Sequence, residues 1–354
     1  MEPTLSRPPR RPILILLLLF AVLGAACAGD EAAGDGGPEV DTEEVLTIPD
    51  GVKLVIGDQG QSLETPLRLA GELDDLPYEV EFASFASGPL VNEAMGAGEI
   101  DLGMMGDTPS LLSFATGLDT VVAGVRVTEG SGSQIVAGEG TGIESLEDLK
   151  GKRIAYTSGT NTHGFVLRAL DSVGLKEEDI EQVDVPLTDL ANVLGSGRAD
   201  AAVVYEIFRP AFFAEHPDAT TLIESNDVVP SYLFLLARRP SVEDKGKRAA
   251  LEDFVGRLAR ASEWVKTHED EWIDAYYVGV QKQTPEAGRA AYEAQGEASW
   301  VEVGGDALED QQEQADLLHA NGRLPEKVDM TGQFDPRYAE RFSNAITTAT
   351  EESE

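Results

Sequence analysis

Short apolar runs alternate with amphipathic segments along most of the chain from Val52 onward. The runs are rich in Val, Ile, Leu, Met and Phe, and the segments between them repeat apolar residues every three or four positions. This pattern predicts alternating strands and helices, which is typical of an α/β protein with mostly parallel sheets flanked by helices. Ligands of such sheets bind at the carboxyl ends of the strands.

The predicted elements fall into two series. The first series has strands at 52–57, 80–85, 101–106 and 121–127, with helices at 63–70, 88–95 and 109–116. The second series has strands at 134–137, 152–156, 183–185, 201–205 and 232–237, with helices at 162–173 and 189–194. Beyond Arg238 the chain is predicted to be mostly helical, and we interpret the aromatic residues of 251–280 as core packing: Trp264, Trp272, Tyr276 and Tyr277.

The two series share a short motif. Residues 96–107 read GAGEIDLGMMGD and residues 195–206 read GSGRADAAVVYE, so both give Gly-x-Gly-x-x-Asp, a mainly apolar strand and then a carboxylate. Because the glycines precede the strand, we interpret them as helix C-caps and not as a dinucleotide-binding loop. The repetition indicates two lobes of like topology, with Asp107, Thr108 and Glu206 facing one another across a cleft.

A polar turn joins a predicted strand to a predicted helix in the second series. Ser158, Thr160, Asn161 and Thr162 supply hydroxyl and amide donors there, and the first amides of a helix have no intrahelical partner. Such a turn can bind a small oxyanion. The same residue types are also preferred as ordinary helix N-caps, so the residues alone leave both interpretations open.

Three further side chains have a functional and a structural interpretation. Thr108 can donate to an anion at the start of a helix or only cap that helix, and Asp107 can cap the helix that begins at Pro109. His163 can reach the cleft, or it is a histidine at the surface or packed in the interior. Glu206 suits the cationic end of a zwitterion, or it is an exposed loop carboxylate.

The sequence gives no support for a cofactor, a metal site or a nucleophilic enzyme. Its histidines are isolated, without the spacing of paired metal ligands: His163, His216, His268 and His319. No hydroxyl or thiol is accompanied by a base in a recognisable arrangement. We therefore expect a binding protein and not an enzyme.

The 354-residue chain is strongly acidic, with a formal net charge of −37. This charge argues strongly against nucleic acid as a partner and against an electrostatic attachment to anionic lipid. If the ligand is an anion, local donors have to overcome the repulsion of the whole protein.

The N-terminus has the pattern of an export signal, predicted at residues 1–26. Three arginines precede the apolar stretch 13–24, which is too short to span a bilayer. Cys27, the only cysteine, follows small residues and resembles the lipidated cysteine of a bacterial lipobox; cleavage after Ala28 is the alternative. Residues 27–45 are small and acidic, which predicts a flexible tether.

Two segments resemble the substrate-binding proteins of bacterial ABC importers, and among them the subgroup for aliphatic sulfonates, taurine and nitrate. Residues 144–175 read ESLEDLKGKRIAYTSGTNTHGFVLRALDSVGL and residues 195–212 read GSGRADAAVVYEIFRPAF. The subgroup's Gly-Asp-x-Pro motif corresponds to residues 106–109, and Gln59 lies where sulfonate binders commonly carry Gln. At 204–207 this chain has VYEI instead of the usual Trp-Asp-Pro-Tyr. A carboxylate is still present, as Glu206, but the aromatic residue is displaced or lost.

The resemblance implies a periplasmic-binding-protein type II clamshell with two lobes and a hinge. The first lobe would take residues 46–127 plus 238–354 and the second 128–237, with crossovers near Thr128–Ser133 and Leu235–Arg238. Closure would hold a small anionic or zwitterionic solute for an ABC permease and its ATPase. The implied ligand residues come from the first lobe, Gln59 and Thr108, and from the second, Ser158, Thr160, Asn161, Thr162, His163 and Glu206.

The resemblance also implies an exported monomer, in the periplasm or at the cell surface, anchored to the membrane through lipid on Cys27. Three alternatives stay open: an exported binder of a thiamine-pyrimidine-precursor-like or other uncharged solute, an enzyme on the same clamshell, and a sensory domain. The predicted export signal argues against the enzyme.

Overall fold

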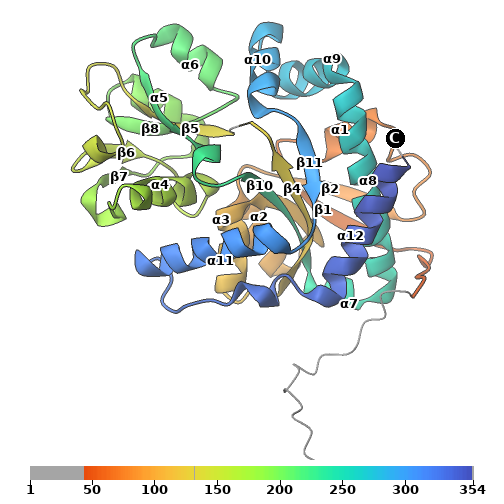
Figure 1. The fold of residues 1–354 in the computed structure, drawn as a ribbon. Helices are drawn as coiled ribbons and strands as arrows, with labels where there is room; N and C mark the ends of the chain where they lie inside the picture. The colour runs from red at the N-terminus through yellow and green to blue at the C-terminus, as the bar shows by residue number, and fades with distance from the viewer. Residues whose placement is uncertain (1–43, 131, 353–354) are drawn as a thin grey trace, which may run out of the picture. The chain divides into compact units, whose positions relative to one another are not determined.

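The computed structural model describes residues 44–130 and 132–352. Within them the strands form two sheets with helices on their faces (Figure 1). The predicted export signal, Cys27 and nearly all of the predicted tether lie outside the described residues. No helix in the described ranges is both long and apolar enough to cross a membrane.

The first sheet has the strand order β11-β4-β10-β3-β1-β2. Its strands are β1 (Lys53–Gln59), β2 (Glu79–Phe85), β3 (Leu102–Gly106), β4 (Thr120–Thr128), β10 (Ser231–Arg238) and β11 (Ala298–Val301). The second sheet has the order β7-β6-β8-β5-β9. Its strands are β5 (Ser133–Ala137), β6 (Arg153–Ala155), β7 (Glu181–Val183), β8 (Ala201–Tyr205) and β9 (Thr220–Glu224). We call the elements packed on each sheet the first lobe and the second lobe.

Helices cover both faces of the first sheet, because its strands bury side chains on both sides. One face packs against long helices, with Phe254 and Phe342 fully buried between them and the sheet. The helices of this lobe are α1 (Glu64–Leu69), α2 (Gly88–Ala97), α3 (Asp107–Ala115), α7 (Arg239–Glu243), α8 (Lys245–Thr267), α9 (Glu269–Trp272), α10 (Pro285–Gln295), α11 (Gly305–Ala320) and α12 (Pro336–Glu351).

The second lobe has its own apolar core around its sheet. Its helices are α4 (Asn161–Ser172), α5 (Leu190–Gly195) and α6 (Arg209–Glu215). Single 3₁₀ turns occur at η1 (Glu147–Leu149), η2 (Glu177–Asp179), η3 (Leu187–Asp189), η4 (Ser225–Asp227) and, in the first lobe, η6 (Met330–Gly332). Strands β9 and β11 and helix α6 were not predicted. The region 251–280, predicted as one amphipathic stretch, ends as the π-helical segment η5 (Ile273–Val280).

The predicted α/β fold with mostly parallel sheets is confirmed, since most strands of each sheet run in one direction. Strands β1, β2 and β3 pair in parallel, as do β6, β7 and β8, but β10 and β5 run antiparallel to their neighbours. The reason is the connection between the lobes. β5 and β10 enter their sheets directly from the other lobe, without the helical crossover that a parallel strand needs.

The repeated Gly-x-Gly-x-x-Asp motif marks equivalent positions in the two lobes. Gly98 ends α2 and Gly197 follows α5, both with the positive φ that favours glycine. Asp101 then accepts a hydrogen bond from the Val55 amide, and Asp200 accepts one from the Arg153 amide. Each aspartate thereby joins the start of a strand to its central neighbour, β3 to β1 and β8 to β6. The predicted likeness of the two lobes is confirmed at this point.

The chain crosses between the lobes at two adjacent places. It leaves the first sheet after Thr128 and enters the second at Ser133, where a crossover was predicted. It returns before Ser231, and not near Leu235–Arg238 as predicted, because β10 lies wholly in the first sheet between β3 and β4. The apolar pattern of 232–237 predicts a buried strand but does not say which sheet it joins.

Replacing Asp101 by alanine should cost about 3 kcal/mol of unfolding free energy. Its buried carboxylate accepts hydrogen bonds from the Val55 amide, the Ser241 hydroxyl and the Lys247 ammonium, and all three would lose their partner. Urea unfolding measures the change. The exposed Asp218 is the control, and its alanine variant should stay within about 0.5 kcal/mol of the parent. Equal effects of the two substitutions would contradict this account.

Candidate functional site

A cavity of about 390 Å³ lies where the end of the first sheet meets the second lobe. Its floor comes from the strands β1, β3, β4 and β10, and its roof from α8, η5 and α10. The second lobe contributes Asn161, at the start of α4, and Tyr205, at the end of β8. Side chains of both lobes therefore share one cavity, as ligand capture by closure requires.

Most of the cavity wall is apolar or aromatic. Ile207 and Phe208 come from the second lobe, and Leu233, Val265 and Trp272 from the first. Trp272 and Tyr277 are buried in a cluster of apolar side chains, which agrees with the predicted core packing. However, Trp272 and Tyr276 also line the cavity, a role that was not predicted for them.

Arg126 is the prominent charge in this cavity. It lies on β4, and its Nε is shielded from solvent without a hydrogen-bond partner. Among the described residues no carboxylate forms an ion pair with Arg126, whereas the neighbouring Lys266 is paired with Glu263 and Glu297. Burial lowers the pKa of the Arg126 guanidinium, and the hydroxyls of Tyr276 and Tyr277 partly oppose this. An arginine stays charged even so, which leaves a half-buried cation facing the cavity.

The polar side chains that line the cavity with Arg126 include Gln59, Asn161 and Tyr205. Gln59 donates from Nε2 to the Met104 carbonyl at 2.7 Å, which fixes its amide at the end of β1. The Tyr205 hydroxyl donates to Asn161 Oδ1 at 2.7 Å. This bond turns Asn161 so that its Nδ2 hydrogens, which have no protein acceptor in the described ranges, can serve a ligand.

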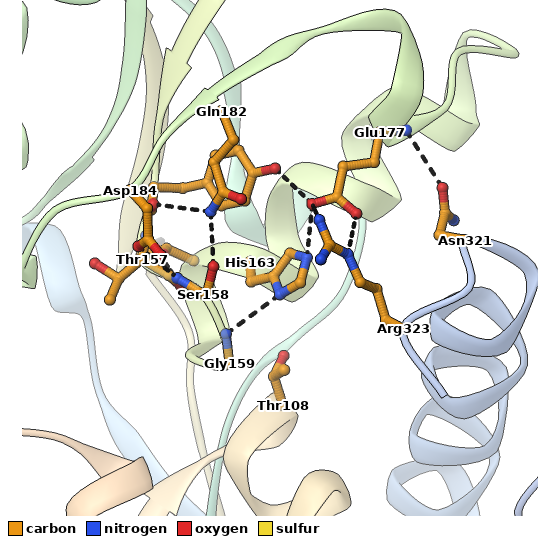
Figure 2. Close-up of polar contacts among 12 residues, drawn as sticks. Thr108, Thr157, Ser158, Gly159, His163, Glu177, Gln182, Asp184, Asn321 and Arg323 are labelled. Atoms are coloured by element: carbon orange, nitrogen blue, oxygen red, sulfur yellow. Dashed lines mark hydrogen bonds and ion pairs between the residues drawn. The ribbon is translucent and has the colours of Figure 1, made fainter. Parts of the chain in front are cut away.

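The hydroxyls of the predicted anion turn are used within the turn itself. Thr160 Oγ1 donates to the Thr157 carbonyl at 2.8 Å, and Thr162 Oγ1 accepts from the Thr157 amide at 3.0 Å. Ser158 accepts a hydrogen bond from Gln182 (Figure 2). Thr160 and Thr162 are buried, and among the turn residues that were predicted as ligands only Asn161 lines the cavity. The turn therefore holds the start of α4 in place.

His163 connects this turn to a buried carboxylate. Its Nδ1 accepts from the Gly159 amide at 3.3 Å, so Nε2 carries the proton and lies 3.1 Å from Glu177 Oε1 (Figure 2). Arg323, which follows α11, donates twice to the same carboxylate, and Tyr156 donates once. Burial alone would raise the pKa of Glu177, but the hydrogen bonds from His163, Arg323 and Tyr156 outweigh it and lower the pKa to about 2.

Thr108 lies at the contact between the lobes and not in the cavity wall. It is fully buried, and its Oγ1 accepts from Gln314 of α11 at 3.2 Å. Gly164 of α4 packs so closely here that a Cβ would lie 2.2 Å from Thr108 Oγ1. Thr108, Thr160, Thr162 and His163 thus belong to the framework that joins α3, α4 and α11.

Glu206 lines a second cavity, of about 170 Å³, next to the chain crossings. Asn161 and Tyr205 line both cavities, so the two spaces are neighbours. Glu206 Oε2 is shielded from solvent and has no hydrogen-bond partner in the described part of the chain. Burial raises the pKa of Glu206 to about 7, although its own backbone amide and the charge of Arg209 partly offset this. Of the two interpretations left open for Glu206, the exposed loop carboxylate is therefore wrong.

Sequence reasoning missed Arg126, although the chain contains a signal for it. Residues 120–128 read TVVAGVRVT, so Arg126 is the single charged residue of a strand that is otherwise small, apolar or hydroxylated. A charged side chain inside such a strand costs folding free energy unless it has a partner of opposite charge. A charged residue at this position therefore indicates a functional site. No three His, Cys, Asp or Glu side chains within the described ranges are placed to hold a metal ion.

Part of this chain matches a known protein family, and the chain is similar in sequence to several named proteins. The profile of a family described as NMT1/THI5 like matches residues 79–271. A protein of Escherichia coli K12 named for binding aliphatic sulfonates is 27% identical over 281 residues, covering 78% of this chain and 86% of the relative. A Haemophilus influenzae protein named for thiamine biosynthesis is 28% identical over 204 residues, covering 56% of this chain and 62% of the relative.

A solved structure shows the same fold. The crystal structure of the periplasmic aliphatic sulphonate binding protein of Escherichia coli superposes with a TM-score of 0.71 at 26% identity, covering 79% of this chain and 91% of that one. The predicted relationship to sulfonate-binding proteins of ABC importers and the predicted two-lobed fold are thereby confirmed.

The unfolding free energy should fall as the pH rises from about 4.5 to 7. Folded Glu206 keeps its proton up to about pH 7, whereas the unfolded chain releases it near 4.5. The stabilisation is therefore complete below pH 4.5 and lost as the pH passes 7, by up to about 3 kcal/mol. Urea unfolding at pH 5, 6 and 7 measures this slope.

The variant Glu206→Gln should flatten this part of the pH profile. Glu215→Gln removes an exposed carboxylate from the nearby helix α6 and should keep the parent slope. A Glu206→Gln protein with an unchanged slope would show that another group is responsible.

Proposed function

The chain belongs to the NMT1/THI5-like family, and from this membership and the geometry of the cavity we propose that it is the solute-binding component of an ABC importer. Its ligand in this proposal is a small organic anion, with sulfonates as the first choice. Taurine-like or nitrate-like solutes are the other members of the class. The protein captures the solute and does not transform it.

The observation that carries this proposal is the guanidinium of Arg126, which lies in a cavity shared by both lobes and has no ion-pair partner in the part of the chain that the structure describes. A half-buried cation without a protein partner is costly unless a ligand supplies the negative charge. Sulfonate oxygens accept from the planar guanidinium in two-point geometry, as carboxylate and phosphate oxygens do. The site therefore has a local charge that can hold an anion in a protein of net charge −37.

The remaining predicted ligand residues divide into two roles in this proposal. Gln59 and Asn161 contact the ligand directly, because both line the cavity. Thr108, Ser158, Thr160, Thr162 and His163 hold the start of α4 against α3 and so position Asn161. Glu206, in the neighbouring cavity, is the proposed partner for an ammonium group if the ligand is a zwitterion.

Ligand capture proceeds by closure of the lobes in this proposal. The two chain crossings, at residues 128–133 and before Ser231, form the hinge. A solute that binds Arg126 of the first lobe and Asn161 of the second makes more contacts in the closed form, and this difference shifts the population towards closure. The closed protein then docks on a membrane permease, and the partner ATPase drives release.

The proposal includes export from the cytoplasm, since the structural relative is periplasmic. Residues 1–26 serve as the export signal, and lipidation of Cys27 anchors the protein to the membrane. Radiolabelled fatty acid incorporation would separate a lipoprotein from a protein cleaved after Ala28.

The variant Arg126→Gln should bind ethanesulfonate about 100-fold more weakly than the parent, because the anion loses a half-buried cation that has no ion-pair partner among the described residues. Isothermal titration calorimetry measures the affinity. Arg126→Lys should recover part of the loss, since it restores the charge but not the two-point geometry.

The control removes an arginine that faces solvent on the same lobe. Arg68→Gln breaks only an exposed pair with Glu64 and should leave the affinity unchanged. If the parent binds sulfonates and Arg126→Gln binds them equally well, the assignment of Arg126 is wrong.

A second candidate ligand is a pyrimidine-like or other uncharged aromatic solute. The relative named for thiamine biosynthesis and the aromatic side chains in the cavity wall favour it. An aminopyrimidine in the same calorimetric series separates the two candidates. Binding of the pyrimidine by both the parent and Arg126→Gln, without binding of any sulfonate, would establish the second candidate.

A further inference from the structure

The cavity is much larger than the smallest anions of the proposed class. Its volume is about 390 Å³, within the range of cavities that hold organic ligands of ten or more heavy atoms. Nitrate is similar in size to one or two water molecules, each of which occupies about 30 Å³ in the liquid. Nitrate or taurine would leave most of this space to water against apolar walls, which is unfavourable.

The walls beyond Arg126 offer apolar contact from both lobes. Ile207 and Phe208 of the second lobe line the same space as Leu233 and Val265 of the first. Burial of an organic group against them gains free energy roughly in proportion to the apolar area removed from water. The complementary ligand therefore carries a sizeable apolar body as well as its charge.

Two aromatic rings define the shape of that body. Trp272 and Tyr276 both line the cavity, and their rings stack with centroids 4.5 Å apart and planes 7° from parallel. Tyr276 belongs to the π-helical segment η5, a rare backbone form that is often found at functional sites. Because the two rings cover one face of each other, a planar ligand group can stack only on an outer face of this pair.

The cation and the two rings line one cavity. A ligand that reaches both carries an anionic group and a planar group in one small molecule. A sulfonate bound to an aromatic ring has this arrangement, and the electron-withdrawing sulfonate also improves stacking on electron-rich Trp and Tyr rings.

Building on the proposed function, we propose that this cavity selects arenesulfonates over short alkanesulfonates, taurine and nitrate. The sulfonate binds Arg126, and the aromatic ring stacks on an outer face of the Trp272–Tyr276 pair.

Calorimetry and tryptophan fluorescence of the purified protein test this selectivity. The probes are p-toluenesulfonate, 2-naphthalenesulfonate, ethanesulfonate, taurine and nitrate. We expect both arenesulfonates to bind at least tenfold more tightly than ethanesulfonate and to quench tryptophan emission, because the bound ring contacts Trp272.

Two matched tryptophan variants locate the ring. Trp272→Leu should reduce the preference for p-toluenesulfonate over ethanesulfonate to less than threefold and remove the quenching. Trp264→Leu is the control, since Trp264 stacks on His268 in the same way, 4.4 Å apart and 7° from parallel, but does not line the cavity. It should keep both the preference and the quenching. If Trp272→Leu does not fold, Tyr276→Leu, at a half-buried position, provides a second test of the preference for p-toluenesulfonate over ethanesulfonate.

The outcomes separate this inference from the proposed function. Ethanesulfonate binding that equals or exceeds arenesulfonate binding in the parent would overturn the inference and leave the proposed function intact. An unchanged preference in Trp272→Leu and in Tyr276→Leu would overturn the assigned position of the ring. No binding of any sulfonate would overturn both, because the inference rests on the anion site at Arg126.

Discussion

The pairing of Thr128 with Ser231 is the constraint from which the rest of the architecture follows. Both residues lie at the point where the chain crosses between the sheets, and Asn226 ties the crossings together by donating to the Glu129 carbonyl at 2.9 Å. Because the crossings are adjacent, β4 and β10 lie side by side in the first sheet. Arg126 is two residues before the first crossing, so its guanidinium reaches the space between the lobes.

Local and global electrostatics oppose each other in this protein. A net charge of −37 repels anions at long range, but salt screens that field over about 8 Å at physiological ionic strength. Inside the cavity, Arg126 is shielded from solvent and from carboxylate partners in the described residues, so its attraction is far less screened. In the proposed function, selectivity therefore comes from the apolar and aromatic walls around Arg126 and not from the charge of the protein as a whole.

The turn at the start of α4 shows why residue type alone did not identify the ligand contacts. Its threonine hydroxyls form hydrogen bonds with backbone groups of the turn. His163 forms a hydrogen bond with Glu177, which also accepts one from Arg323 (Figure 2). Arg323 follows α11 of the first lobe, whereas Glu177 belongs to the second. The hydroxyl-rich turn is therefore part of the contact between lobes, and only Asn161 extends from it into the cavity.

The sequence by itself determined the alternation of strands and helices and the likeness of the two lobes, because apolar periodicity and the repeated Gly-x-Gly-x-x-Asp motif are local properties. The relationship to sulfonate-binding proteins came from the resemblance of residues 144–175 and 195–212 to that family. Tertiary structure alone decided which sheet received the apolar strand 232–237 and that this strand runs antiparallel. It also decided that Arg126, Trp272 and Tyr276 share a cavity although up to 150 positions separate them in the chain. The pairing of distant strands depends on the whole fold, and so does the burial of a charged side chain away from ion-pair partners. No local pattern of residues specifies either of them.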